Sequence, residues 1–226
     1  TPNLGRIDAE PCRSYSETYW EARDRFLTAA TAAGAELTSL EVVRGGKDSP
    51  SYTMDVAVLR GSGDEKSGLV VHSSGVHGVE GYSGSAVQVA FLRHAASNPE
   101  SIRRGGDGAS SPGPFPTIVL VHAVNPYGMA HYRRFNENNV DLNRNALPER
   151  RWSEVKARDP NVAGYDDFDG LFNPPRPPTP WDATASFLLR AVLNIARHGF
   201  LNLKRALVAG QYHNPRGVFY GGGGLE

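Results

Sequence analysis

A short apolar run that ends in a turn carrying a histidine and a glutamate constrains this chain more than any other feature. The stretch reads Val70-Val71-His72-Ser73-Ser74-Gly75-Val76-His77-Gly78-Val79-Glu80-Gly81. Its β-branched start predicts a strand, its Gly and Ser residues predict a turn, and the small residues that follow predict a helix. An imidazole and a carboxylate at this spacing, just past a strand end, can converge on one metal ion.

The rest of the chain alternates strand-like and helix-like patterns. We expect strands at residues 37–43, 52–59, 69–72, 117–123 and 203–209, and helices at residues 14–34, 86–94 and 182–198. The first two strands predict a hairpin with a turn at 45–50, and the apolar strand at 69–72 is expected to be buried in the sheet. Alternation of this kind predicts an α/β domain with a mixed or mainly parallel sheet.

Several local signals add detail to this outline. Ser14 or Ser16 is expected to cap the first helix, and Gly34 to end it. Asp182 or Thr184 is expected to cap the helix that ends near residue 198. Residues 96–116 predict a surface loop, and residues 125–128 a turn by composition. We expect a single domain over residues 1–226, with an ordered Pro-rich excursion at about 148–180, anchored by Trp152, Tyr165, Phe168 and Phe172.

Composition excludes several classes of protein. The chain has 24 basic and 24 acidic residues, so no global field favours nucleic acid or an anionic membrane as a partner. Cys12 is the single cysteine, which excludes an intramolecular disulfide and a Cys-based zinc site and favours a reducing, cytoplasmic compartment. No apolar run approaches the roughly 18 residues of a membrane-spanning helix. The chain starts at Thr1 rather than Met, so a leader could precede it.

The His77/Glu80 pair has two interpretations. Zinc accepts imidazole nitrogen and carboxylate oxygen, and catalytic zinc sites commonly use three protein ligands plus water. We expect Gly78 to let the backbone bend so that both side chains face one point. However, His-x-x-Glu alone is a weak pattern. The alternative is a histidine in a polar turn and a glutamate near a helix N-terminus, where the helix dipole favours a carboxylate.

A second polar stretch, residues 133–145, is dense in arginine and asparagine. Guanidinium groups bind carboxylates bidentately, and a guanidinium beside a metal can stabilise an oxyanion. The alternative is a hydrogen-bonded loop in which Asp141 simply pairs with an arginine. This stretch alone does not decide between a substrate site and a structural loop.

Together the two stretches resemble the zinc carboxypeptidase (metallocarboxypeptidase) superfamily, and most of all an uncharacterised carboxypeptidase-like branch of it. The superfamily carries His-x-x-Glu after a strand, then Asn-Pro-Asp-Gly, then Arg-x-Asn and Val-Asp-Leu-Asn-Arg. The corresponding residues here are His77-Gly78-Val79-Glu80, Asn125-Pro126-Tyr127-Gly128, Arg134-Phe135-Asn136 and Val140-Asp141-Leu142-Asn143-Arg144. The branch also carries a segment that matches Gly210-Gln211-Tyr212, Pro215-Arg216-Gly217 and Phe219-Tyr220-Gly221-Gly222, so the resemblance covers roughly residues 14–222.

The resemblance implies a function and a set of site residues. It implies an α/β fold with a mixed, mainly parallel central sheet and helices on both faces. His77 and Glu80 would be ligands of a Zn²⁺ cofactor, Arg134 would stabilise the oxyanion, and Asn143 and Arg144 would hold a substrate carboxylate. The implied protein is a hydrolase of the metalloprotease type. It would cleave an amide bond next to a free carboxylate, in a small peptide or an N-acyl amino acid, without a nucleic-acid or membrane partner.

Parts of the superfamily's site do not appear in this sequence. Its third zinc ligand follows a strand in an Asp-x-His pattern, which does not occur here, so the ligand is either His213 or a residue beyond Glu226. A late catalytic glutamate and a late substrate-binding tyrosine are not found either. We therefore expect a C-terminally truncated fold. The alternative function is an inactive fragment or a carboxylate-binding module.

Other polar residues carry weaker signals. Gly81-Tyr82-Ser83-Gly84-Ser85 departs from the Gly-x-Ser-x-Gly pattern, which argues against a serine hydrolase. His72 and His122 lie at or near strand ends, where core packing or hydrogen bonding is the expected role. The acidic cluster Asp166-Asp167-Asp169 lacks the spacing of a calcium loop and is expected to be a solvated surface.

Overall fold

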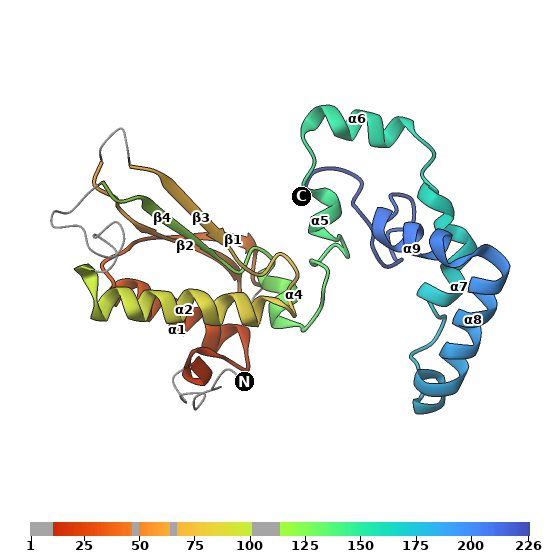
Figure 1. The fold of residues 1–226 in the computed structure, drawn as a ribbon, viewed down its shortest axis with the longest axis horizontal. Helices are drawn as coiled ribbons and strands as arrows, with labels where there is room; N and C mark the ends of the chain where they lie inside the picture. Colours follow the sequence, from red (N-terminus) through yellow and green to blue (C-terminus); the bar gives the residue numbers. More distant parts are fainter. Residues whose placement is uncertain (1–10, 47–49, 64–66, 101–113) are drawn as a thin grey trace, which may run out of the picture. The chain divides into compact units, whose positions relative to one another are not determined.

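The structure is a computed structural model that describes residues 11–46, 50–63, 67–100 and 114–226. The chain forms two compact units, Thr1–Arg134 and Phe135–Glu226 (Figure 1). The first unit carries the sheet, and the second is built from helices and irregular segments. The predicted hairpin turn at 45–50 and the predicted loop at 96–116 fall partly outside the described residues.

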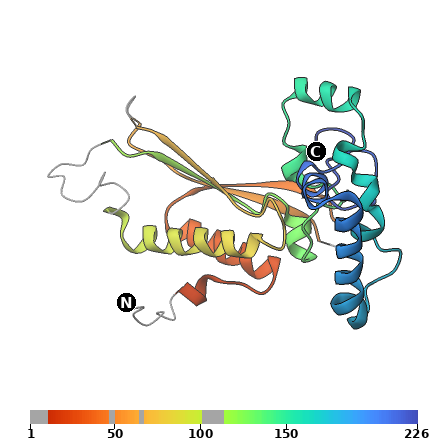
Figure 2. The same ribbon diagram turned by 45° about the vertical axis from the view of Figure 1, so that its right-hand side comes forward.

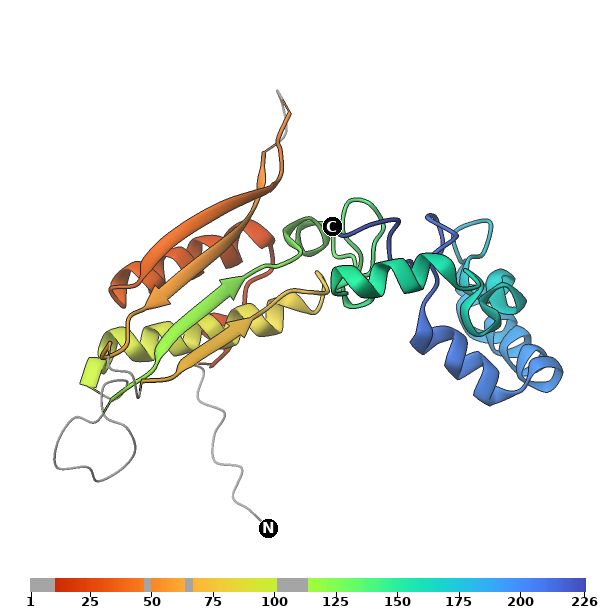
Figure 3. The ribbon, with the colours of Figure 1, turned by 90° about the horizontal axis from the view of Figure 1, so that it is seen from above.

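The first unit contains a four-stranded mixed sheet in the order β1-β2-β4-β3 (Figure 3). Its strands are β1 (Glu36–Val43), β2 (Tyr52–Leu59), β3 (Leu69–Ser73) and β4 (Thr117–His122). The pairs β1/β2 and β2/β4 are antiparallel, and β3/β4 is parallel. The prediction of an α/β fold with a mixed sheet and a hairpin is confirmed, but the prediction of a mainly parallel sheet is wrong. A parallel pair needs a crossover connection, and a helix joins the strands only between β3 and β4 of this described sheet.

Two helices, α1 (Tyr19–Ala32) and α2 (Gly81–Ser97), cover the same face of the sheet (Figure 2). The core between them and the strands is made of buried apolar side chains: Phe26, Ala29, Ala30, Ala57, Val89, Leu92 and Leu120. The expectation of helices on both faces is therefore wrong for the described part of this unit. The cap of α1 is Thr18, whose hydroxyl accepts from Glu21 N at 3.2 Å, rather than Ser14, which lies in the short helix η1 (Pro11–Ser14), or Ser16.

Strand β3 differs most from its prediction. It lies at the edge of the sheet rather than inside it, and Leu69, Val70 and Val71 are 66%, 47% and 59% exposed. The strand carries no charged residue and no proline, the features that normally protect an edge. Its near-continuous apolar composition is that of an interior strand of a parallel sheet. The prediction that this strand is buried in the sheet is therefore wrong, since within the described residues no neighbour covers its outer edge.

The core of the first unit also holds polar side chains that form an ion pair or hydrogen bonds. Asp55 is fully buried and forms an ion pair with Arg23, with 2.8 Å between Arg23 Nε and Asp55 Oδ2. His122 is fully buried, with its Nε2 2.9 Å from Ser85 Oγ. The side-chain amide of Gln88 reaches β3, where its Nε2 lies 3.0 Å from His72 Nδ1 and donates to His72 O at 3.0 Å. The expected structural roles of His72 and His122 are confirmed.

The second unit is helical. Its elements are α5 (Leu142–Asn145), α6 (Glu149–Ala157), η2 (Val162–Phe168), α7 (Asp169–Phe172), η3 (Asp182–Ser186), α8 (Phe187–His198) and α9 (Phe200–Ala209). The strand predicted at 203–209 is wrong, because that segment is α9. Leu203 and Ala206 are its buried residues, and their three-residue spacing is helical.

The Pro-rich excursion at 148–180 is ordered, with Tyr165, Phe168 and Trp152 buried as anchors and Phe172 half-buried. The helix predicted to end near residue 198 is present as η3 and α8. Asp182 does not cap it, because its carboxylate instead accepts from Thr179 N at 3.0 Å and Arg176 Nη1 at 2.8 Å. The side chain of Thr184 lies outside the described residues. None of the described helices is both long and apolar enough to cross a membrane.

Candidate metal centre and anion-binding arginine

The turn that carries His77 and Glu80 is held in place by backbone pairing. After β3, Ser74 N donates to Val121 O at 3.0 Å, and Val124 N donates to Ser74 O at 3.0 Å. Asn125 N then donates to Gly75 O at 2.8 Å. The strand pairing of β3 with β4 therefore continues into both following turns. As a result, the predicted strand–turn–helix unit places His77 and Glu80 directly before α2.

The two sequence motifs meet backbone to backbone. A Cβ added at Gly78 would lie 2.0 Å from the carbonyl carbon of Gly128, so only glycine fits. Val79 N donates to Arg133 O at 3.1 Å, which ties the same turn to the second motif. Gly78 does not adopt a positive φ, so its role differs from the bend that was predicted. The glycine is required by close approach.

The side chain of Asn125 links two parts of the second motif. It is 1% exposed and caps the short helix α4 (Pro126–Ala130), where its Oδ1 accepts from Gly128 N at 2.8 Å. Its Nδ2 donates to Arg134 O at 3.2 Å. The predicted turn at 125–128 is thus the first turn of a helix. Because the same side chain bonds to both Gly128 and Arg134, it fixes the backbone of Arg134 relative to the turn of His77.

One carboxylate lies between the predicted metal ligand and the predicted oxyanion stabiliser. His77 Nδ1 lies 3.3 Å from Glu80 Oε2, and Arg134 Nη1 lies 3.3 Å from Glu80 Oε1. The side chain of His77 is 10% exposed, that of Arg134 is 30% exposed and that of Glu80 is 65% exposed. The three groups therefore meet at an accessible surface of the first unit.

The spacing of His77 and Glu80 suits a zinc ion. Two donors bound to tetrahedral zinc at about 2.0–2.1 Å are separated by about 3.3–3.4 Å. The observed separation of Nδ1 and Oε2 is 3.3 Å, which is also longer than most hydrogen bonds of this type. Both side chains can thus occupy two positions of one coordination shell. Among the residues that the structure describes, no group of three or more His, Cys, Asp or Glu side chains is placed to hold a metal.

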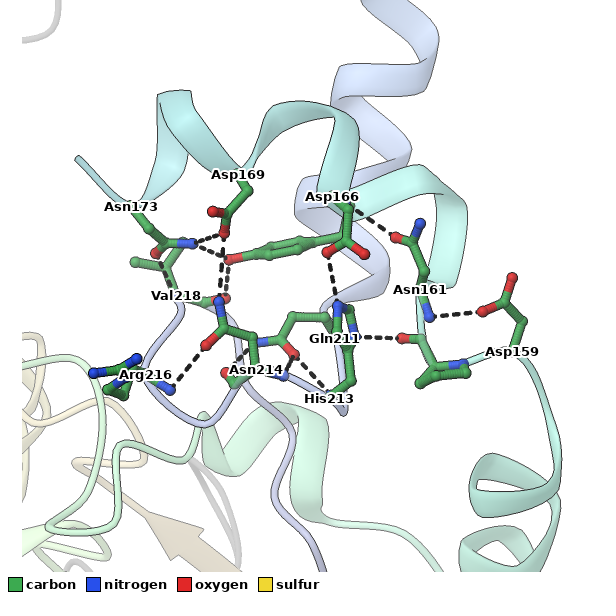
Figure 4. Close-up of polar contacts among 12 residues, drawn as sticks. Asp159, Asn161, Asp166, Asp169, Asn173, Gln211, His213, Asn214, Arg216 and Val218 are labelled. Carbon is green, nitrogen blue, oxygen red and sulfur yellow. Dashed lines mark hydrogen bonds and ion pairs between the residues drawn. The ribbon is translucent and has the colours of Figure 1, made fainter. Parts of the chain in front are cut away.

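The ring of His213 is engaged within the second unit. Its Nδ1 lies 2.8 Å from Pro160 O, and its Nε2 lies 2.7 Å from Asp166 Oδ1 (Figure 4). Both ring nitrogens are thus used by contacts within the second unit. The suggestion from the sequence that His213 is the third zinc ligand therefore has no support in this geometry. Asp166, expected to belong to a solvated acidic surface, is exposed but holds this histidine.

Arg144 lies in the second unit with a donor that has no partner. Its Nε is buried and makes no hydrogen bond within the described residues. A buried donor without an acceptor costs free energy, and a bound anion would remove that cost. Asn143, on the same short helix α5, is exposed, and its backbone N donates to Asp141 Oδ1 at 3.1 Å. Asp141 thus caps α5.

The other asparagines of this stretch bond to the chain itself. Asn145 Nδ2 donates to Gly221 O at 3.0 Å and to Gly224 O at 2.7 Å. Asn139 Nδ2 donates to Pro215 O and Gly217 O, each at 3.0 Å. These bonds join residues 136–145 to the Gly-rich segment 210–226. The hydrogen-bonded-loop interpretation is therefore correct for these asparagines. It could not be separated from substrate binding in the sequence, because their partners lie 76 to 79 residues away along the chain.

The structure thus defines two units. One is an α/β unit with a His-x-x-Glu turn facing a guanidinium, and the other is a helical unit in which the buried Nε of Arg144 has no hydrogen-bond partner within the described residues. The chain belongs to the family described as "Protein of unknown function (DUF2817)", whose model matches residues 15–225. No curated protein and no solved structure matches the chain.

Proposed function

We propose that the protein is a zinc-dependent metallohydrolase that cleaves an amide bond next to a free carboxylate, as the resemblance to metallocarboxypeptidases implies. The substrate would be a small peptide with a free C-terminus or an N-acyl amino acid. One observation carries the proposal: the carboxylate of Glu80 faces His77 with one oxygen and Arg134 with the other. This arrangement joins two metal-binding donors to a cationic group.

In the proposed site, His77 and Glu80 hold the zinc ion. When bound, zinc supplies Lewis acidity for attack on a carbonyl. Arg134 supplies the second electrostatic element, because its guanidinium is held by Glu80 before any substrate arrives. A cationic donor fixed in advance stabilises the negative charge that develops on a carbonyl oxygen without rearranging during the reaction.

We assign substrate selection to Arg144 and Asn143 in the second unit. A guanidinium binds a carboxylate through two parallel hydrogen bonds. Nε is one of the donors available for such a pair, and in Arg144 it has no partner within the described residues. Peptides or acyl amino acids with a free carboxylate are thus favoured over their amides. The charge balance of the chain, with 24 residues of each sign, leaves this selection to a local group.

The test compares free and amidated substrates. The natural protein would be incubated with N-acetyl amino acids and short peptides, each with a free or an amidated C-terminus. We expect cleavage of the free acids only, and an Arg144→Gln variant should lose most of this preference. Equal cleavage of acid and amide by the unaltered protein would remove Arg144 from the proposal.

Metal dependence is tested on its own. His77→Ala should lower the zinc content of the purified protein, measured by elemental mass spectrometry. His94→Ala, which changes an exposed histidine at the far end of α2, serves as the matched control. Equal zinc content in both variants would refute the assigned metal site.

A second candidate function is carboxylate binding without turnover. This function is favoured because, among the described residues, no third metal ligand joins His77 and Glu80. In that case, residues 1–226 would bind N-acetyl amino acids through Arg144, measurable by calorimetry, while hydrolysis stays at the uncatalysed rate with added zinc. Hydrolysis that depends on both zinc and His77 would exclude it.

A further inference from the structure

We propose that a cavity beside the Pro-rich excursion binds an organic carboxylate with an apolar body, and that Arg190 holds the carboxylate. The cavity has a volume of about 410 Å³ and lies among α7, residues 174–178 and the beginning of α8, so we call it the α7/α8 cavity. Its described lining residues all belong to the second unit, and they include neither Arg144 nor the proposed zinc ligands. The inference therefore adds a second ligand site and does not rest on the proposed function.

The walls of the α7/α8 cavity are mostly apolar. Six of the nine described lining residues are Leu171, Phe172, Pro174, Pro175, Pro178 and Phe187. A proline ring fixes its own φ, so the three prolines lose little conformational freedom when a ligand binds. The volume falls within the range of small-molecule pockets, about 300–1,000 Å³. Phe187 is 46% exposed, so a ligand would bury apolar surface there. The walls therefore suit the apolar body of a small molecule.

The other three lining residues are charged, and two of them pair with each other. Asp182 is buried, and its carboxylate accepts hydrogen bonds from Thr179 N at 3.0 Å, Thr179 Oγ1 at 2.7 Å and Arg176 Nη1 at 2.8 Å. These bonds, those from Thr179 above all, hold the pKa of Asp182 well below its ordinary value, so the carboxylate stays ionised. Asp182 is thus neutralised by Arg176.

Arg190 is the cation that remains for a ligand. Its Nη2 lies 3.8 Å from Asp182 Oδ1, beyond hydrogen-bond distance, and its Nε donates to Ser186 O at a long 3.4 Å. A guanidinium has five N–H donors, and these contacts engage at most two of them. The side chain is 41% exposed, so a ligand can reach it. A guanidinium of this kind pairs with a carboxylate through two parallel hydrogen bonds.

The charge of the lining residues selects a monoanion. Two guanidinium groups and one carboxylate leave a single positive charge. A carboxylate carries one negative charge, whereas a phosphate monoester carries about 1.5 to 2 at pH 7. We therefore assign the cavity to a monocarboxylate rather than to a phosphate ester. An apolar body against the walls and a carboxylate on Arg190 would use both kinds of surface.

Calorimetry with 4-phenylbutyrate tests the site. The natural protein and its Arg144→Gln variant are both titrated, so that the proposed substrate site cannot account for the heat. We expect binding in both proteins. Binding should be weaker on the order of tenfold for 4-phenylbutanamide, which lacks the charge, and for acetate, which lacks the apolar body. Equal binding of acid and amide would overturn the proposal, as would binding that Arg144→Gln abolishes. Tighter binding of 4-phenylbutyl phosphate would overturn the choice of a carboxylate.

Two variants with matched controls identify the residues. Arg190→Gln should weaken 4-phenylbutyrate binding on the order of tenfold, whereas Arg197→Gln, which changes an exposed arginine later on α8, should not. Phe187→Ala should also weaken binding, because it removes apolar surface from the wall. Leu188→Ala, which changes a 62% exposed residue of the same helix outside the cavity lining, should not. An unchanged affinity in Arg190→Gln, or an equal loss in Arg197→Gln, would contradict the role of Arg190.

Hydrogen–deuterium exchange of the unaltered protein locates the ligand without any substitution. Saturating 4-phenylbutyrate should slow amide exchange in residues 171–190 and leave residues 140–146 unchanged. Slowing at residues 140–146 alone would place the ligand at Arg144 and refute the α7/α8 site. Slowed exchange at residues 171–190, in a protein that hydrolyses none of the proposed substrates, would refute the proposed function and support this site.

Discussion

Arg134 and Glu80 are joined by an ion pair, with 3.3 Å between Arg134 Nη1 and Glu80 Oε1. The other carboxylate oxygen faces His77, so Arg134 is oriented by a group that is itself a proposed metal ligand. The arginine is thus fixed in relation to the proposed metal ligands. This relationship leads directly to the first prediction.

Changing Arg134 should impair catalysis without removing the metal. For Arg134→Ala we expect a fall in kcat of about 10²–10³, the loss seen when one oxyanion donor is deleted. Zinc content should stay within the range of the unaltered protein, because His77 and Glu80 remain. Steady-state hydrolysis of an N-acyl amino acid, with metal analysis of the same samples, measures both. Arg133→Ala is the neighbouring control, and an equal loss in both variants would contradict the assigned role.

Gly78→Ala should destabilise the first unit strongly. The added Cβ would lie 2.0 Å from the Gly128 backbone, which no rotamer change can relieve. We expect a loss of about 3 kcal/mol or more in the free energy of unfolding, at the upper end of overpacking effects. Urea denaturation followed by circular dichroism measures the loss. Gly68→Ala is the matched control, because nothing lies within 4 Å of its added Cβ. Similar midpoints for the two variants would disprove the close contact.

Acid should weaken the first unit through His122. Burial lowers the pKa of His122 to about 4, against an ordinary value near 6.5. Above pH 6.5 the ring is neutral in both states, so its contribution to stability is complete. Between about pH 6.5 and pH 4 the unfolded chain takes up a proton that the native ring does not, and about 3 kcal/mol of stability is lost. In urea titrations at pH 7, 5.5 and 4.5, His122→Gln should show a smaller fall than the unaltered protein, and parallel falls would reject the assignment.

The edge strand β3 should promote self-association. Val71 is 59% exposed on a strand whose outer edge has no neighbour within the described residues. A lysine on an edge strand opposes strand pairing, so Val71→Lys should reduce concentration-dependent association of residues 1–226. Val87→Lys, on α2 and equally exposed at 59%, removes as much apolar surface without touching the edge. Light scattering over a concentration series distinguishes them, and equal effects would mean that general hydrophobicity, and not the strand edge, drives association.

Local patterns predicted local structure well. The bounds of β2 agree with the structure at both ends, and those of β1 and β4 agree within one residue. The failures at β3 and at residues 203–209 have different causes. The apolar composition of β3 does not reveal its position in the sheet, and the apolar residues of 203–209 suit a strand until the helical spacing of Leu203 and Ala206 is noticed.

The sequence motifs indicated which residues of the candidate site lie near one another, but not the contacts that hold them in place. The proximity of His77, Glu80 and Arg134 followed from motif order, since the residues follow neighbouring parallel strands. The contact of Gly78 with Gly128 could not be predicted, because glycine also serves turns, and only the folded backbone shows which role applies. The contact of His213 Nε2 with Asp166 Oδ1 joins residues 47 positions apart, and nothing in either local pattern signals it.

The contact between Gly78 and Gly128 is made by main-chain atoms, so the frame around positions 77 and 80 does not depend on which side chains stand there. Exchanging the donors, for example by Glu80→His or His77→Asp, should leave that frame intact and change the metal preference of the proposed site. The turn can therefore be transferred to another protein as a rigid scaffold for redesigned ligand pairs, provided that Gly78 and Gly128 are transferred together.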